Sequence, residues 1–211
     1  MNPKKTISVL LTASAGLSVA AAVLYIYSKD GYLLLPCFFA SACTAYCSHY
    51  APDKKTAVKY IITACVIYTV GILLSTVFRR DMGFLLTSGK KTEYLKTHIH
   101  LKPFEQIKYY CKHIYSSEFF HCFTGLFGNL AVFVPFSLFL PKIFKKANTR
   151  LGFFVMMLGF ILFVELGEAL LMTGFFETDD ILLNLGGAWV AYELLQNETT
   201  RDAVDVKLHL R

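Results

Sequence analysis

Polar side chains capable of acid–base or ligand chemistry lie in the last apolar third of the sequence. Glu165 and Glu168 fall inside one apolar segment, and Asp179, Asp180 and Asn184 open the next. A carboxylate in hydrocarbon costs about 2.5–3.5 kcal/mol on insertion scales. Such groups persist where they face the interior of a helix bundle and have a structural or chemical role. These five residues are therefore the first candidates for a functional site.

The spacing of these residues sorts them onto two helical faces. Glu165 and Glu168 are three positions apart and share one face of a helix. Two buried carboxyl groups this close do not both ionise readily, so the pair must hold a proton or face a cation or a bound group. Asp180 and Asn184 are four positions apart and share a face of the next helix. An acidic side chain also suits a helix N-terminus, so Asp179 either caps that helix or belongs to the pocket.

Small residues accompany these polar groups and predict close approach of helices. Gly187 and Ala188 follow Asn184, and Gly125 and Gly128 precede Asn129 in an earlier apolar segment. Small residues let two membrane helices pack closely, and asparagine cross-links them by hydrogen bonds. We therefore predict a single polar pocket made of Asn129, Glu165, Glu168, Asp180 and Asn184. The alternative is that these groups only satisfy one another between helices.

The elements that must position these residues are membrane helices. The 211-residue chain is 55% hydrophobic, which is too apolar for an ordinary soluble domain. Because lipid offers no hydrogen bonds to the backbone, apolar segments long enough to cross it should be helices. The sequence predicts an all-α, polytopic membrane helix bundle with about six transmembrane helices, at residues 6–27, 31–50, 57–78, 119–141, 151–176 and 180–196.

The long polar stretch between the third and fourth predicted spans contains a helical pattern. In residues 101–115, apolar side chains recur every three or four positions, at Phe104, Ile107, Cys111 and Ile114. Charged side chains occupy the other side, which is typical of an amphipathic helix in a membrane interface. The alternative is a loop helix packed on the bundle.

The basic residues predict the orientation of the chain in the membrane. Lys4 and Lys5 precede the first span, Lys54 and Lys55 follow the second, and further lysines lie between the fourth and fifth. The opposite loops carry Lys29 with Asp30 and the acidic turn 177–180, although Arg79 and Arg80 also fall on that side. By the positive-inside rule, both termini are predicted to lie in the cytoplasm and the acidic turn outside.

Other common chemistries find no support in the sequence. The net charge of +6 is spread in short runs between apolar segments, which indicates membrane orientation and not nucleic-acid binding. The histidines match no zinc spacing, and the usual hydrolase, nucleotide and zincin motifs do not occur. We assign no catalytic residue, metal or cofactor, and expect a binding protein more than an enzyme.

Three segments together resemble the VanZ-like family of bacterial membrane proteins. They are HLKPF at 100–104, NLAVFVPFSLFLP at 129–141, and VELGE with GFFETDDILLNLGGAWVAY within 164–192. The polar positions of the family pattern fall on Asn129, Glu165, Asp180, Asn184 and Gly187. Glu168 stands where that pattern usually has glutamine, Phe175 where arginine is usual and His100 where asparagine is usual. These departures make the site more acidic and argue against a purely anionic ligand.

The resemblance implies a domain organisation and a cellular location. Residues 1–56 would form an added N-terminal transmembrane hairpin, 57–196 the VanZ-like core, and 197–211 a polar cytoplasmic tail. The protein would be a multi-pass protein of the bacterial cell membrane, and its oligomeric state stays open.

The namesake of the family is linked to resistance to the glycopeptide teicoplanin, which acts on lipid-linked cell-wall precursor. The predicted orientation puts the acidic pocket at the outer leaflet, which is compatible with the action of teicoplanin at the outer surface of the membrane. We therefore expect the pocket to bind a lipid-linked envelope precursor or a glycopeptide and to affect teicoplanin susceptibility. Two alternatives remain from other classes. One is a membrane enzyme acting on lipid-linked substrates, in which Glu165 and Glu168 share acid–base work. The other is a small transporter with these carboxylates as a proton or cation relay.

Overall fold

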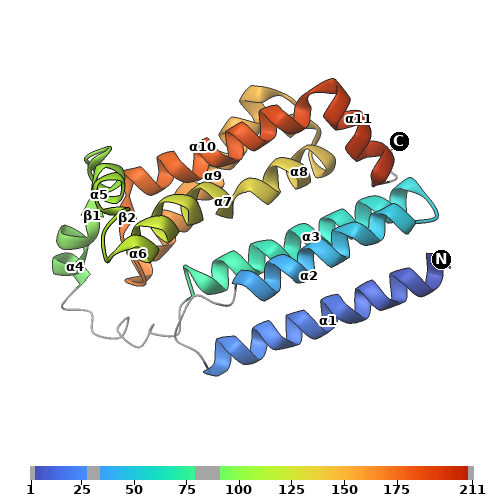
Figure 1. Ribbon diagram of the computed structural model, residues 1–211, viewed down its shortest axis with the longest axis horizontal. Helices are drawn as coiled ribbons and strands as arrows, with labels where there is room; N and C mark the ends of the chain where they lie inside the picture. Colours follow the sequence, from blue (N-terminus) through green and yellow to red (C-terminus); the bar gives the residue numbers. More distant parts are fainter. Residues whose placement is uncertain (1–2, 28–33, 79–90, 209–211) are drawn as a thin grey trace. The chain divides into compact units, whose positions relative to one another are not determined.

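The computed structural model describes residues 3–27, 34–78 and 91–208, and these are almost entirely helical (Figure 1). The residues contact one another mainly within two compact units, residues 1–81 with 196–211 and residues 82–195. The predicted orientation also uses four charged residues that lie outside the described residues: Lys29, Asp30, Arg79 and Arg80.

The first unit is built from α1 (Pro3–Tyr27), α2 (Leu34–Tyr46) and α3 (Lys54–Ser75), with α11 (Glu198–Lys207) from the C-terminal end. Helix α2 packs against both α1 and α3 (Figure 1). Buried hydroxyls join them: Ser14 Oγ donates to the Ala40 carbonyl at 3.0 Å, and Ser41 Oγ donates to the Ala64 carbonyl at 2.8 Å. A short 3-10 turn, Cys47–Tyr50, ends α2, and Asp53 then caps α3 by accepting the Thr56 N–H at 2.8 Å.

The second unit carries every predicted site residue. It begins with α4 (Lys91–His98), strand β1 (Ile99–His100) and α5 (Glu105–His113). A nearly continuous helical stretch follows, made of α6 (Phe119–Phe123), a π-helical turn (Thr124–Gly128), α7 (Asn129–Val132) and α8 (Val134–Ile143). After a 3-10 turn at Lys145–Asn148 come α9 (Arg150–Leu171), strand β2 (Phe176–Glu177) and α10 (Thr178–Gln196).

Helices α8, α9 and α10 form the core of the second unit. Phe153 of α9 stacks on Tyr192 of α10 with ring centroids 4.1 Å apart, and both side chains are buried. Phe136 of α8 meets Phe160 of α9 edge-on at 5.1 Å. Ser137 of α8 donates to the Ala188 carbonyl of α10 at 2.7 Å. Aromatic packing and one buried hydroxyl therefore hold the three helices together.

Helix α9 has well-defined ends, which fix where its carboxyl groups emerge. Thr149 caps its N-terminus by accepting the Gly152 N–H at 3.1 Å. At the other end Met172 adopts the left-handed conformation, with φ of 59°, and Thr173 N–H returns to the Glu168 carbonyl at 2.9 Å. This is the geometry of a helix C-terminal motif that turns the chain sharply.

Three helices among the described residues are long and apolar enough to cross a membrane: Lys54–Ser75, Phe119–Ile143 and Arg150–Leu171. They agree with the predicted spans at 57–78, 119–141 and 151–176. The other predicted spans fall on α1, α2 and α10, which are helices but stay predictions as spans. Helix α5 lies within residues 101–115, and its position in a membrane interface likewise stays a prediction.

Candidate functional site

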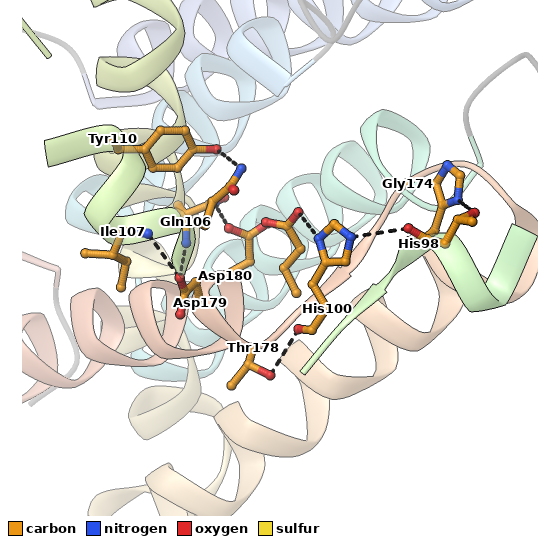
Figure 2. A network of polar contacts seen from close by, with 12 residues as sticks. His98, His100, Gln106, Ile107, Tyr110, Gly174, Thr178, Asp179 and Asp180 are labelled. Atoms are coloured by element: carbon orange, nitrogen blue, oxygen red, sulfur yellow. Dashed lines mark hydrogen bonds and ion pairs between the residues drawn. The ribbon is translucent and has the colours of Figure 1, made fainter. Parts of the chain in front are cut away.

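Two strands of only two residues each bring distant parts of the second unit together. Strands β1 and β2 pair in parallel, with Ile99 opposite Phe176 and His100 opposite Glu177. His100 Nδ1 lies 3.3 Å from Glu177 Oε1, and Thr178 Oγ1 donates to the His100 carbonyl at 3.3 Å (Figure 2). The segment before α5 is thereby fixed against the start of α10.

Asp179 holds the N-terminus of α5. Its carboxylate accepts the backbone N–H groups of Phe104, Gln106 at 2.7 Å and Ile107 at 3.0 Å, as Figure 2 shows for the last two. The first-turn amides of a helix lack partners within the helix and carry positive partial charge, so a buried carboxylate suits them. Phe104 takes the left-handed conformation, with φ of 67°, to direct its N–H to this carboxylate. Asp179 therefore caps α5 across the site and not its own helix.

A group of carboxyl side chains lies behind this cap. Glu165 of α9 is 5% exposed, and its carboxyl interacts electrostatically with those of Glu168, Asp180 and Glu177. It also accepts the backbone N–H of Glu177. We call Glu165, Glu168, Glu177 and Asp180 the carboxyl cluster. The Asn129 amide of α7 donates to Asp180, so three helices contribute to one polar group.

Asn184 lies one turn along α10 from Asp180 and is 3% exposed. Its side-chain Oδ1 is buried and has no hydrogen-bond partner among the described residues. A buried acceptor left without a donor costs about 1–3 kcal/mol, so each such atom in a native structure calls for an explanation. A bound donor or a water would satisfy it.

Aromatic rings line the cluster on the side of α4. His98 stacks between Tyr94, with centroids 3.7 Å apart, and Phe175, at 4.4 Å. Tyr94 OH donates to the Gly174 carbonyl at 2.8 Å. A Cβ on Gly174 would lie 2.2 Å from Glu168 Oε2, so a side chain at this position would require the Glu168 carboxyl group to shift. Burial raises the pKa of the Tyr94 phenol, and the nearby Glu168 carboxyl raises it further.

Tyr110 closes the opposite side of the cluster. Its hydroxyl accepts Gln106 Nε2 at 3.0 Å, and its ring fills the space beside Gly125, where a Cβ would lie 2.4 Å from Tyr110 Cζ. Burial raises the pKa of this phenol, although the Gln106 bond opposes the shift, and the carboxyl groups of Asp180 and Glu177 raise it further. Tyr110 thus stays protonated near neutral pH.

The predicted packing residues occupy different environments. A Cβ on Gly187 would lie 1.8 Å from the Leu130 carbonyl oxygen, so α7 and α10 touch at this point. Ala188 is fully buried and its carbonyl accepts the Ser137 bond. Gly125 faces Tyr110, whereas a Cβ on Gly128 would meet no described atom within 4 Å.

A cleft opens beside the carboxyl cluster, with a volume of about 550 Å³. We call it the β1–α5 cleft. Its lining comes from β1, the start of α5 and the residues between them, and from the end of β2 and the start of α10: Ile99, His100, Leu101, Lys102, Glu105, Gln106, Glu177, Thr178 and Asp179. The other three members of the carboxyl cluster, with Asn129 and Asn184, are not part of this lining. Across the described ranges, no three His, Cys, Asp or Glu side chains are arranged to hold a metal ion.

The sequence matches the family described as VanZ/LLP1 over residues 65–197, which is more than half of the chain. The chain belongs to the VanZ/LLP1 family. No curated protein and no solved structure gives a significant match.

The VanZ/LLP1 match includes all the residues of the site. Three motif segments that are separated in the sequence meet in the second unit. HLKPF supplies His100 and the backbone N–H of Phe104, residues 129–141 supply Asn129, and residues 164–192 supply the carboxyl groups. Phe175 is half exposed and packs on His98, so this member has a neutral ring at that position.

Sequence reasoning missed several residues that the VanZ/LLP1 site contains. Glu177 was assigned only to an acidic turn, and His100 only to a motif, yet the two are in contact. Tyr94 carried no signal because its partner, the Gly174 carbonyl, lies far along the chain, and Gln106 and Tyr110 carried none although they bond to each other within α5. The HLKPF and GFFETDD motifs were the available signal, since a family motif in a polar loop indicates a role beyond packing.

Proposed function

We propose that this VanZ/LLP1 protein is a multi-pass protein of the bacterial cell membrane that binds a cell-envelope ligand at its acidic site. The observation that carries the proposal is the convergence of acceptors, of which Glu165 and Asn184 are buried and Glu168 and Asp180 half-buried. The carboxyl groups of Glu165, Glu168 and Asp180 interact electrostatically with one another, and Asn184 Oδ1 has no partner among the described residues. Acceptors gathered in this way favour a ligand rich in N–H and O–H donors.

This donor requirement narrows the ligand class. Carboxylates repel a purely anionic group and accept hydrogen bonds from amines and sugar hydroxyls. Lipid-linked envelope precursors and glycopeptides both carry sugars and peptide groups, which supply such donors. We therefore propose a lipid-linked envelope group or a glycopeptide as the ligand, and lowered teicoplanin susceptibility as the consequence.

The proposed membrane arrangement brings the site to the outer leaflet. Six spans with both termini in the cytoplasm put the start of α10 and the end of α9 on the outer side. The domain organisation follows the same scheme, with a hairpin at 1–56, a core at 57–196 and a cytoplasmic tail at 197–211. The lipid bilayer is the constant partner in this arrangement, with α5 at the interface.

The first prediction tests the acidic site in cells. A teicoplanin-susceptible bacterial host expressing the protein should show a teicoplanin inhibitory concentration raised at least about twofold. Asp180→Asn and Asn184→Ala should each return it to the level of the empty vector, because they remove acceptors from the ligand. Glu198→Gln is the control, since that side chain is exposed on α11 in the other unit.

Membrane fractions from each strain should contain equal amounts of protein, which separates loss of binding from loss of insertion. An unchanged inhibitory concentration on expression of the wild-type protein would rule out the teicoplanin role. A raised concentration that both variants retain would rule out the acidic site as its origin.

A further inference from the structure

The β1–α5 cleft carries charge of both signs, unlike the carboxyl cluster behind it. His100 and Lys102 line it together with Glu105 and Glu177. Asp179 also lines it, but its carboxylate is occupied by three backbone N–H groups of α5. The groups left to meet a ligand are therefore two cationic or protonatable side chains and two carboxylates.

These four side chains form two loose pairs. His100 Nδ1 lies 3.3 Å from Glu177 Oε1, and Lys102 Nζ lies 3.5 Å from Glu105 Oε1. Close charge-assisted hydrogen bonds measure about 2.7–2.9 Å, so neither pair is tightly closed. The Lys102 and Glu105 side chains are 82% and 66% exposed, and exposed pairs of this kind are worth little. The Lys102–Glu105 pair can thus open to a ligand at low cost. The His100–Glu177 pair is less exposed, at 50% and 11%, and His100 Nε2 also lies 3.2 Å from the Thr97 carbonyl oxygen.

The rim of the cleft is apolar. Ile99 and Leu101 line the cleft and are 39% and 66% exposed, and Phe104, two residues beyond Lys102, is 52% exposed. Exposed apolar side chains beside paired charges match an amphiphile, whose headgroup meets the charges while its chains pass the rim. The volume of about 550 Å³ lies within the usual range for ligand sites, about 300–1,000 Å³.

We propose that the β1–α5 cleft binds the headgroup of a zwitterionic aminophospholipid, with the phosphate at Lys102 and His100 and the primary ammonium at Glu177 and Glu105. A phosphate alone would meet two carboxylates, and an amine alone would meet Lys102 and His100. Only a group with both charges is complemented by both pairs.

The inference rests on the proposed function in one respect, which is that the cleft lies at a membrane surface. It does not depend on the ligand of the carboxyl cluster. Asp180 and Asn184, the residues varied in the teicoplanin experiment, do not line this cleft, so either proposal can fail while the other stands.

The test compares lipids that differ in one chemical feature. The purified protein in detergent is titrated with phosphatidylethanolamine, phosphatidylcholine and phosphatidylglycerol of identical acyl chains, and bound lipid is counted by native mass spectrometry. Phosphatidylcholine keeps both charges but has no N–H donor, and phosphatidylglycerol has no amine. We expect phosphatidylethanolamine to bind at least about 10-fold more tightly than either, the effect of a lost hydrogen bond to a charged group.

Variants connect this preference to the cleft. Lys102→Glu should weaken phosphatidylethanolamine binding at least about 10-fold, and its exposed position leaves folding intact. Glu177→Gln should abolish the preference for ethanolamine over choline. Lys108→Ala is the matched control, because Lys108 is exposed on α5 and does not line the cleft.

Equal or tighter binding of phosphatidylglycerol would overturn the proposal, as would a Lys102→Glu variant that binds like the wild-type protein. Soluble phosphoethanolamine provides the last arm. The lipid is the ligand if a 10-fold excess of soluble phosphoethanolamine leaves the lipid bound. Full displacement at equal concentration would instead identify a free metabolite and contradict the lipid assignment.

Discussion

At the scale of single residues, the site depends on carboxylates that serve different purposes within a short stretch. Asp179 and Asp180 are neighbours, yet the first accepts backbone N–H groups from α5 and the second accepts the Asn129 amide. Consecutive helical residues point about 100° apart, so adjacent aspartates reach different elements. A sequence pattern indicates that both lie at the start of an apolar helix, but it does not show which partner each one meets.

Asp179 gives the clearest prediction at this scale. Asp179→Ala should lower the free energy of unfolding by about 2–3 kcal/mol, because three backbone donors of α5 lose a charged acceptor that is only 2% exposed. Asp179→Asn keeps one acceptor oxygen and should lose less. Thermal unfolding of the purified protein in detergent measures both. An Asp179→Ala variant as stable as the wild-type protein would show that α5 does not depend on this cap.

At the scale of elements, helices were predictable and the links between them were not. Apolar runs of about 20 residues predict α3, α9 and the stretch from α6 to α8, because a bilayer leaves the backbone few alternatives. Strands β1 and β2 have two residues each, too few for any alternating pattern. Their pairing places His100 against Glu177, and although both residues lie in motif segments, no periodicity predicted that the two would meet.

The contact between α7 and α10 is tested by two adjacent glycines of α10. Gly187→Ala should destabilise the protein by about 1–3 kcal/mol, since its Cβ would lie 1.8 Å from the Leu130 carbonyl oxygen and 3.0 Å from Leu130 Cα. Gly186→Ala is the control, because its Cβ would meet no described atom within 4 Å. That change should leave stability unchanged or raise it by about 0.5–1 kcal/mol through helix propensity.

Thermal unfolding midpoints of the two alanine variants, measured side by side, give the comparison. Equal midpoints would mean that α7 and α10 separate easily and that the small residues are not needed for packing. A lower midpoint for Gly187→Ala alone would support the close approach that the small-residue pattern predicted.

At the scale of the whole molecule, the sequence predicts a hairpin at 1–56, a core at 57–196 and a tail at 197–211, whereas contacts divide the structure into residues 1–81 with 196–211 and residues 82–195. Apolar segments resemble one another, so periodicity does not reveal which helices pack together. Buried hydroxyls join α1, α2 and α3, whereas the site lies entirely within residues 82–195. The prediction that Asn129, Glu165, Glu168, Asp180 and Asn184 form one polar pocket follows from the cost of burying polar groups in a membrane. The structure joins two of them, Asn129 and Asp180, by a hydrogen bond. Their role as a ligand site stays a prediction.

The proposed orientation in the membrane gives the last prediction. Single cysteines are introduced at Ser116 and at Lys145 in a background with all six native cysteines replaced by alanine or serine. Both positions are exposed in the structure, so side-chain burial does not limit their labelling. A membrane-impermeant maleimide added to intact cells should label the cysteine at 116 strongly and the one at 145 weakly. In permeabilised cells the maleimide should label both cysteines, which controls for differences in their reactivity.

Six spans with cytoplasmic termini place residue 116 outside and residue 145 inside, because the number of crossings between them is odd. The reverse pattern would invert the protein and move the carboxyl cluster to the cytoplasmic leaflet, where an extracellular glycopeptide has no access to it.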